Sequence, residues 1–487
     1  MAEFAQLKDL KGIEVIEVKQ FEDAQRDRPD FKNVYLKVLY FILREGIIST
    51  SRKYFAIKSP QKRYLTFVFV RFNQKRYVNV SVQFNQEPTG FVIINKFYIS
   101  SDINFENIYN NIDYYLCQFN QFAEIENYEL LGIDVSDSVS FDVIPPNHKE
   151  KYNKGLFIYG LGRYVKIFII QHFKNISKIA CTDYNEQVVE YFKTKYGFKY
   201  GFVLSSNSFP LLSNVYQPVV IIATFHSDHA SLAYEVFNRN PNAIIFIEKP
   251  PTVTLDDLNK LIELYNKGAH LEIGFNRRFI GYNKYVKVKV KNRVVFITCL
   301  IKEALIAKSH WYLWKNQGTR ITGNAVHWFD LANFWIDSIP VEINLLANLN
   351  DSESSAISVL YKNGSILNIT ITDKGNSLRG VQEKFEIRFG DETIFIDDYL
   401  SLTHIKQNGI RIRKWKLHRD KGHNVMYENF LRIIERKKTS EYRLYDLIRT
   451  SLVTYYASEM LSNNIRNMNI ENEVNKYLGL GVNAINI

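Results

Sequence analysis

Short apolar segments alternate with amphipathic segments through the middle of the chain, from about residue 154 to residue 274. Residues 219–224 form a continuous apolar run, as expected for a strand that is buried on both faces, whereas residues 255–267 carry apolar side chains at helical spacing. The predicted strands are 156–160, 176–182, 219–224, 243–248 and 270–274. The predicted helices between them are 163–173, 186–196, 230–238 and 255–267. Strands separated by single helices imply right-handed crossovers and a parallel sheet.

The pattern changes to strand after strand beyond residue 285. Predicted strands here are 286–301, 341–349, a hairpin over 356–372, 385–389, 393–396 and a pair about Asn408-Gly409. The hairpin turns at Asn363-Gly364, a pair suited to a type I′ turn. Helical spacing recurs at 327–335, 424–435 and 444–461. We therefore expect one large antiparallel sheet with helices covering one face.

The first 150 residues predict a small α+β module. Its elements are a helix over 31–46, a hairpin of strands 64–72 and 76–84, a third strand at 91–99 and a helix over 104–122. The module ends in a polar stretch in which Pro145-Pro146-Asn147 is typical of a linker.

Composition places the chain among globular proteins: of its 487 residues, 46% are hydrophobic and 23% are charged. There is no run of eighteen uncharged apolar residues and no charged–apolar–small leader at Met1, so we expect no membrane span and a cytoplasmic protein. Cys117, Cys181 and Cys299 are far apart and show no metal-ligand spacing. We therefore expect buried free thiols and no metal site.

The formal charge of +11 is spread along the chain, and many basic residues alternate with acidic ones. Such an excess fits solvated faces or a pocket for an anionic small molecule better than a nucleic-acid surface. We therefore expect a small-molecule ligand and no nucleic-acid partner.

A glycine turn follows the first strand of the middle region. Gly160 and Gly162 stand between this strand and the next helix, where glycine permits a tight turn and a close approach of the backbone to a pyrophosphate. Val165 replaces the third glycine of the usual fingerprint, and Asp183 ends the second strand, where an acid can hold a ribose hydroxyl. The pattern predicts a Rossmann domain that binds NAD, and the charge of Asp183 disfavours NADP.

Sharper motifs follow the later strands. In chain order they are Ala223-Thr224 with His226 and His229, the tripeptide Glu248-Lys249-Pro250, Gly274-Phe275-Asn276-Arg277-Arg278-Phe279, a glycine-containing stretch ending in His327-Trp328-Phe329-Asp330, and Asp420-Lys421-Gly422-His423. This ordered set resembles the glucose–fructose oxidoreductase/inositol dehydrogenase (Gfo/Idh/MocA) family. It is most similar to the sugar oxidoreductase half of bacterial two-domain proteins, over roughly residues 154–463.

The resemblance implies three parts: an accessory module (1–150), a Rossmann dinucleotide-binding domain (151–276) and a C-terminal α+β substrate and oligomerisation domain (277–487). It implies that Lys249, next to a cis-prone Lys-Pro bond, hydrogen-bonds the reacting hydroxyl near the nicotinamide. It also implies that His327 is the general acid/base. Many family members carry Asp four residues before this histidine, where this chain has Gly323, and the two-domain relatives often carry Glu at the position of Asn324.

The candidate site residues form two groups. Those expected at the cofactor are Gly160, Gly162, Arg163, Asp183, Thr224, His226, His229, Glu248, Lys249 and Pro250. Those expected at the substrate are Arg277, Arg278, Trp311, Arg320 and Asn324. Alternatives stay open for some: His229 could cap the following helix, His423 could cap the helix near residue 424, and the two neighbouring arginines could pair with acids.

The functional expectation is a hydride transfer between NAD(H) and a secondary alcohol of a sugar or nucleotide sugar, with surface polysaccharide biosynthesis as a candidate role. The alternatives are a cofactor-retaining sugar hydrolase or epimerase, and a nucleotide-binding protein without turnover. We expect a homo-oligomer formed through the C-terminal sheet. Residues 21–30 and 44–50 faintly resemble the alcohol-dehydrogenase-like half of the two-domain proteins, but zinc ligands are missing, so the module is expected to be non-catalytic.

Overall fold

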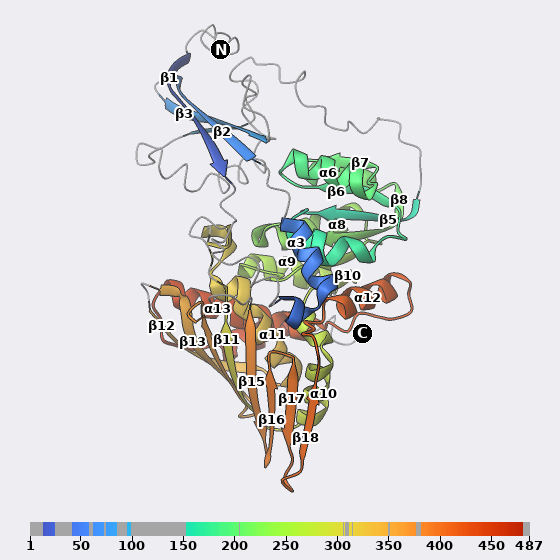
Figure 1. The fold of residues 1–487 in the computed structure, drawn as a ribbon. Coiled ribbons are helices and arrows are strands. Elements are labelled where there is room, and N and C mark those ends of the chain that lie inside the picture. The colour runs from blue at the N-terminus through green and yellow to red at the C-terminus, as the bar shows by residue number, and fades with distance from the viewer. Residues whose placement is uncertain are drawn as a thin grey trace.

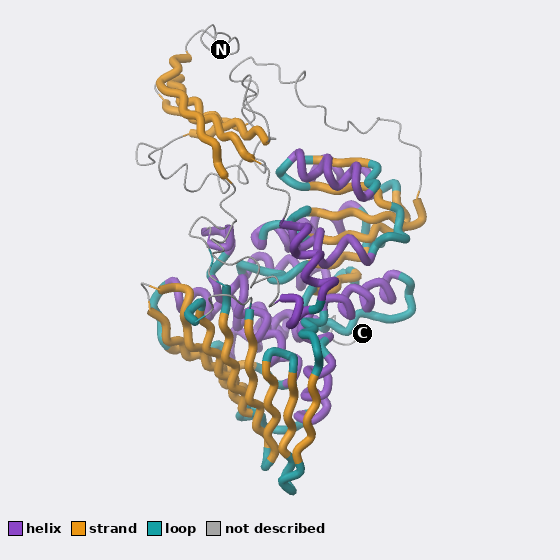
Figure 2. Tube along the Cα trace, in the orientation of Figure 1, coloured by secondary structure: helices purple, strands orange, loops and turns teal. Residues whose placement is uncertain are grey.

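The computed structural model describes residues 13–24, 41–57, 62–72, 75–84, 95–98 and 152–480, except for 204, 305, 307–310, 314, 349–350 and 376–380. The described elements form a four-stranded, a six-stranded and a nine-stranded sheet. The six-stranded sheet (green) and the nine-stranded sheet (yellow to orange) are the two large bodies in Figure 1, and Figure 2 shows the helices packed around them.

The six-stranded sheet is parallel throughout and has the order β10-β9-β8-β5-β6-β7. Its strands are β5 (Tyr152–Tyr159), β6 (Lys178–Thr182), β7 (Tyr200–Phe202), β8 (Val215–Ile222), β9 (Ile244–Ile247) and β10 (His270–Ile273). Chain direction across the sheet reverses between β5 and β8, and such a switch point is where ligands of open parallel sheets bind. The predicted Rossmann domain is confirmed; β7 and the short helix α7 (Phe209–Leu212) were not predicted.

Helices cover both faces of this sheet because their apolar stripes match its buried surface. They are α6 (Glu186–Tyr196), α8 (His229–Arg239) and α9 (Leu255–Asn266). α9 begins with a capping box in which Thr254 accepts from the Asp257 backbone and the Asp257 carboxylate accepts in return. The helix predicted after the glycine turn is irregular: a π-helix, η1 (Val165–Ile169), runs into a 3₁₀ turn, η2 (Ile170–His172).

The nine-stranded sheet has the order β18-β17-β16-β15-β11-β14-β13-β12-β19. Its strands are β11 (Phe296–Lys302), β12 (Pro340–Asn348), β13 (Asp351–Tyr361), β14 (Ile366–Thr372), β15 (Gln382–Phe389), β16 (Glu392–Asp397), β17 (Ser401–Ile405), β18 (Arg411–Trp415) and β19 (Asn467–Asn469). The antiparallel prediction needs one correction, because β11 pairs with β14 in parallel. The helices that follow β10 along the chain are α10 (Gly281–Val290), α11 (Val326–Trp335), α12 (His423–Ile434), α13 (Leu444–Ser462) and α14 (Glu471–Leu480).

One face of the large sheet is buried and the other is open. Along β11 every second residue is buried, including Ile297 and Ile301, whereas Phe296 and Leu300 are half exposed. The buried side chains share one core with those of α11 and α13. The helices α11 and α13 confirm the predicted cover of one face, whereas the helix predicted over 424–435 (α12) packs on the parallel sheet instead. Oligomerisation through the open face stays a prediction.

The predicted strand over 286–301 was wrong in its first part. Residues 281–290 form the helix α10, with Tyr282, Val286 and Val290 buried at four-residue spacing. The alternation of Val and Lys over 286–290 has a period of two and mimics a strand, but the buried positions follow the helical period.

The described part of the N-terminal module consists of a sheet of order β1-β2-β3-β4 and the helix α3. The hairpin of β2 (Lys62–Phe72) and β3 (Lys75–Phe84) and the strand β4 (Asn95–Tyr98) confirm the strand predictions, whereas β1 (Ile13–Ala24) was not foreseen. Of the helix predicted over 31–46, residues 41–45 are helical and 31–40 lie outside the described residues; α3 (Ile47–Ile57) continues beyond Gly46. The helix predicted over 104–122 and the linker at 145–147 also lie outside them.

Residues 41–57 contact the two large bodies. Arg44 forms an ion pair of 2.8 Å with Asp398, Glu45 pairs with Arg419, and α3 packs on η1 (Figure 1). Cys181 and Cys299 are buried free thiols, as predicted, and Cys117 lies outside the described residues. In the described part of the chain, no helix has the length and apolarity needed to cross a membrane.

Candidate active site

The glycine turn lies at the switch point of the parallel sheet. Gly160 has φ +84°, and a Cβ there would lie 2.3 Å from the carbonyl oxygen of Ala223 at the end of β8. A side chain at Gly160 is therefore excluded by both backbone conformation and space. At Gly162 a Cβ would meet nothing within 4 Å, and this glycine and Arg163 are exposed. The open side of the turn thus leaves room for a pyrophosphate against the backbone of Gly162.

We expect Gly162→Val to abolish NADH binding without unfolding the protein, because the new side chain would fill the open side of the turn. Gly160→Ala should instead destabilise the fold, since its Cβ would collide with the backbone of β8. Thermal unfolding and NADH fluorescence titration of both variants check this contrast. An unchanged NADH affinity in Gly162→Val, with the fold intact, would contradict the proposed location of the cofactor.

Asp183 ends β6 beside the glycine turn. Its Oδ2 accepts a hydrogen bond of 2.7 Å from the backbone of Leu161, and its Oδ1 accepts one of 3.0 Å from the backbone of Asn185. Burial raises the pKa of this carboxyl group, and the two backbone donors oppose that rise. Asp183 therefore stabilises the glycine turn through hydrogen bonds to its backbone.

Lys249 follows β9 and joins the two large bodies. Its Nζ donates to the hydroxyl of Tyr312 (3.1 Å) and to the carbonyl of Gly323 (2.9 Å). The Lys249–Pro250 peptide bond is cis, as the sequence predicted. The side chain is partly buried.

His229 supports this bend instead of capping α8, whose N-cap is Asp228. Its Nδ1 lies 2.7 Å from the carbonyl oxygen of Pro250 and its Nε2 lies 3.2 Å from that of Thr224. Burial lowers the pKa of His229 to about 4, so the neutral ring donates one hydrogen bond. The imidazole thus connects the chain after β8 to the chain after Lys249.

His327 lies one helical turn beyond Gly323. The π-helix η8 (Ile321–Ala325) continues into α11, so the carbonyl that accepts from Lys249 and the imidazole of His327 lie near each other on one helical stretch. The pKa of His327 lies well below its ordinary value, mainly because of burial and also because of Arg277, Lys249, His423 and Lys421. The ring is therefore neutral at physiological pH and can accept a proton.

Two buried polar atoms on this helical stretch have no hydrogen-bond partner among the described residues. They are Nδ1 of His327 and Oδ1 of Asn324, three positions apart. Trp311 lies close by, with its ring centroid 4.7 Å from that of His226 and 4.3 Å from that of Tyr312. The ring nitrogen of His226 lies 3.3 Å from the carbonyl of Gln317. The predicted residues Trp311, Asn324 and His226 are thus gathered around the Lys249–His327 region.

Glu248 does not face the same way as Lys249. Its carboxylate is buried and accepts a hydrogen bond from the hydroxyl of Tyr427 on α12. Burial raises the pKa of Glu248 to about 7. The Glu248 side chain therefore ties the end of β9 to α12, and any contact with a cofactor would come from its backbone.

The three arginines expected at the substrate require correction. Arg277 forms two hydrogen bonds with Glu383 (2.7 and 2.8 Å), and Arg278 forms two with Asp330 (2.8 and 2.6 Å) and one with Asp446 (3.0 Å). Arg320 pairs with Glu353. All three guanidinium groups are buried, so pairing with acids describes them better than binding of an anionic substrate.

His423 also differs from expectation. Gly422 is the N-cap of α12, with φ +83° and no side-chain cap. The His423 ring stacks on Phe168 (centroids 4.4 Å apart) and its Nε2 lies 3.2 Å from Nδ2 of Asn276.

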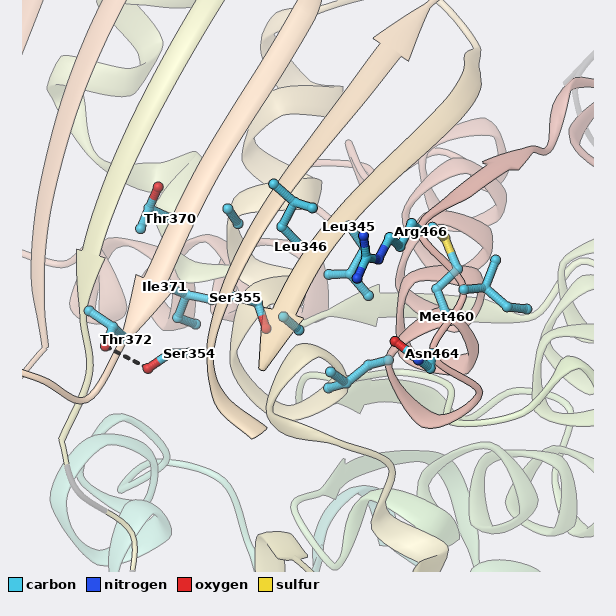
Figure 3. A pocket seen from close by; sticks show the side chains of 14 residues that line it. Leu345, Leu346, Ser354, Ser355, Thr370, Ile371, Thr372, Met460, Asn464 and Arg466 are labelled. Atoms are coloured by element: carbon cyan, nitrogen blue, oxygen red, sulfur yellow. Dashed lines mark hydrogen bonds between the residues drawn. The ribbon is translucent and has the colours of Figure 1, made fainter. Parts of the chain in front are cut away.

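A pocket of about 570 Å³ lies elsewhere, between the ends of β12–β14 and the chain after α13 (Figure 3). Its wall includes Leu345, Met460 and Arg466, and Ser354 and Thr372 are hydrogen-bonded across one side (2.8 Å). None of the candidate site residues lines it, so we do not assign it to the reaction.

Sequence reasoning missed Tyr312, the partner of Lys249. It stands next to Trp311 in a stretch without regular periodicity, and sixty-three residues separate it from the lysine that it contacts. The neighbouring Trp311, a predicted substrate residue, was the only feature of the sequence that pointed to Tyr312.

No protein-family model matches the chain. The oxidoreductase YrbE of Bacillus subtilis (strain 168) is 24% identical over 251 residues, which are 47% of this chain and 70% of that protein.

Solved structures resemble the chain more extensively. GenD2 from gentamicin A biosynthesis, solved in complex with NAD, has a TM-score of 0.54 and 13% identity, and the match covers 67% of this chain and 99% of GenD2. The myo-inositol 2-dehydrogenase of Lactobacillus plantarum has a TM-score of 0.54 and 14% identity, with 66% of this chain and 100% of the enzyme covered. From β5 onward, the chain therefore has the fold of these solved dehydrogenases, a parallel Rossmann-type sheet followed by a large, mostly antiparallel sheet.

Proposed function

We propose that the protein is an NAD-dependent oxidoreductase acting on a secondary alcohol of a sugar or sugar derivative. The observation that carries the proposal is the bond from Lys249 Nζ to the carbonyl of Gly323, one turn before His327. A cation from the parallel-sheet half and a neutral imidazole from the other half thereby meet at one place. The resemblance to an oxidoreductase of B. subtilis and to dehydrogenases of sugar-like alcohols supports the same reaction class.

The residues present fit a dinucleotide. The open side of Gly162 and the exposed Arg163 would receive the pyrophosphate, and Asp183 would lie at the adenosine ribose. The backbone around Lys249-Pro250 would lie beside the nicotinamide. When bound, the cofactor supplies the hydride acceptor or donor.

His327 and Lys249 would divide the work on the hydroxyl. The neutral imidazole of His327 accepts the hydroxyl proton during oxidation and returns it during reduction. The ammonium of Lys249 donates a hydrogen bond to the same oxygen and stabilises the negative charge that develops there. The two unpartnered atoms, Nδ1 of His327 and Oδ1 of Asn324, offer further hydrogen-bonding positions for substrate hydroxyls or water.

The direct test is a screen of polyols, sugars and nucleotide sugars for NADH production, with Lys249→Ala run in parallel. Lys260→Ala, which removes a partly buried lysine on α9 that is paired with Asp256, is the matched control. A substrate whose oxidation requires Lys249 but not Lys260 supports the proposal. Tight NADH binding with no turnover on any alcohol would favour a nucleotide-binding protein, and product formation without net NADH would favour the cofactor-retaining reaction.

Asp183→Ala should relax the preference for NAD over NADP. The carboxylate would repel a 2′-phosphate, and its removal takes away that repulsion together with a ribose hydrogen bond. It also removes the two hydrogen bonds that support the glycine turn, so the affinity for both cofactors should fall, and the affinity for NADH should fall more. The ratio of the Kd values for NADPH and NADH, measured by fluorescence titration, should fall in the variant. Equal affinities for the two cofactors in the unmodified protein would contradict the assignment.

A further inference from the structure

Among the described residues, the ammonium of Lys249 forms one hydrogen bond to a side chain, the phenol of Tyr312. The Tyr312 hydroxyl accepts from Nζ at 3.1 Å, and the ammonium also lies 5.5 Å from the centroid of the Tyr312 ring. Tyr312 in turn packs against Trp311 and His226, with centroids 4.3 and 4.8 Å away. The phenol is thus held from two sides while it contacts the lysine.

Gly323 makes room for this arrangement. A Cβ at residue 323 would lie 3.1 Å from two carbons of the Tyr312 ring and 3.3 Å from Cε1 of His226. These distances are tighter than ordinary van der Waals contact, so a Cβ at 323 would require the Tyr312 ring or the His226 ring to shift by a few tenths of an ångström. Gly323 is helical and has no positive φ, so its backbone conformation does not require glycine. The ring occupies the space that a side chain at 323 would need, which explains a glycine here.

We propose that Tyr312 is the positioning residue of Lys249, and that the glycine at 323 leaves the space in which the Tyr312 ring reaches the ammonium. The proposal rests on the proposed function in that Lys249 is taken as the group that binds the reacting hydroxyl. Both partners of the ammonium are neutral, since one is a phenol and the other a backbone carbonyl. A neutral pair aims the lysine without cancelling its charge, and that charge is then available to a developing alkoxide.

The first test uses Tyr312→Phe, which keeps the ring and removes only the hydroxyl. We expect kcat to fall by about 10- to 100-fold, the effect of losing one hydrogen bond to a charged group, while the Kd for NADH stays unchanged. Tyr234→Phe is the matched control: it removes a hydroxyl that donates to Glu263 on the far helices α8 and α9. It should leave kcat unchanged.

A second readout does not depend on turnover. Short pulses of reductive methylation, followed by peptide mass spectrometry, measure the fraction of Lys249 present as the free amine at each pH. An ammonium that loses a hydrogen-bond acceptor gives up its proton more easily. The labelling profile of Lys249 should therefore move to lower pH in Tyr312→Phe and stay in place in Tyr234→Phe. If the protein oxidises no alcohol, this profile still tests the pairing.

A swap of partners completes the test. Tyr312→Ala should lower kcat and move the labelling profile of Lys249 to lower pH. In Tyr312→Ala/Gly323→Asp, kcat should rise again in part and the labelling profile should move back in part, because the space left by the ring admits a carboxylate beside the ammonium. Gly323→Asp alone should be impaired, since it collides with the Tyr312 ring. An unchanged labelling profile in Tyr312→Phe, or a Tyr312→Ala/Gly323→Asp variant no better than Tyr312→Ala in folded protein, would overturn the proposal.

Discussion

Replacing His327 by alanine should lower turnover by about 10²–10⁴-fold, the range that general acid/base catalysis supplies. The affinity for NADH should hardly change, because in the proposed mechanism the imidazole would act on the substrate hydroxyl and the dinucleotide would bind at the parallel sheet. Steady-state kinetics and NADH titration of the same preparation measure the two effects. The control is His270→Ala, which removes an exposed histidine at the start of β10.

The pH profile of the unmodified protein provides an independent check. Burial and the cations Arg277, Lys249, His423 and Lys421 lower the pKa of His327 well below 6.5. Glu383, which pairs with two of these cations, only partly offsets their charge. The base form of the imidazole is therefore present at neutral pH and is lost only when the pH falls through the lowered pKa. An acidic limb of kcat/KM near or above pH 6.5 that disappears in His327→Ala would contradict the electrostatic argument, and full activity of His327→Ala would refute the assigned role.

Arg278→Ala should destabilise the fold by about 3–5 kcal/mol, the cost of removing one partner from a buried ion pair. Arg278 binds Asp330 through two hydrogen bonds and Asp446 through a third, and its guanidinium also lies 4.4 Å from the ring centroid of Tyr442. Asp330 belongs to α11, the helix that carries His327. Without Arg278, its buried carboxylate would lack its cationic partner and would destabilise the packing of this helix. Denaturant unfolding followed by tryptophan fluorescence measures the change.

Arg293→Ala is the matched control for this prediction. Arg293 pairs with Glu392 at 2.9 Å, but its side chain is 47% exposed, so its loss should cost less than about 1 kcal/mol. Equal losses in the two variants would show that the buried cluster contributes no more than a surface pair.

Strand and helix periods predicted the parallel half of the fold well because its buried strands are continuous apolar runs. The prediction was wrong where a segment carries both the period of a strand and the period of a helix. In α10 the alternation of Val and Lys has the period of a strand, but the core on one side of the helix buries Val286 and Val290. The parallel pairing of β11 with β14 could not be foreseen, because antiparallel and parallel neighbours share the same alternation.

The sequence motifs identified Lys249 and His327 as candidate site residues because both residues belong to motifs that follow one another in a characteristic order along the chain. They could not say what surrounds these residues. The partners of Arg277 and Arg278 are separated from them by 52 to 168 residues, and no local spacing records such a contact. A pair of adjacent arginines in a site motif is therefore ambiguous until the positions of the acids are known.

The contacts of residues 41–57 have a consequence for the synthesis of the chain. Glu45 and its partner Arg419 are 374 residues apart, and Arg44 pairs with Asp398. During translation this segment leaves the ribosome early and must wait until β16, β17 and β18 have been made before it can bind. The parallel sheet can assemble earlier, because its strands lie between residues 152 and 273. Residues 41–57 would thus reach their final place only after β18 has been made, well after the parallel sheet can form.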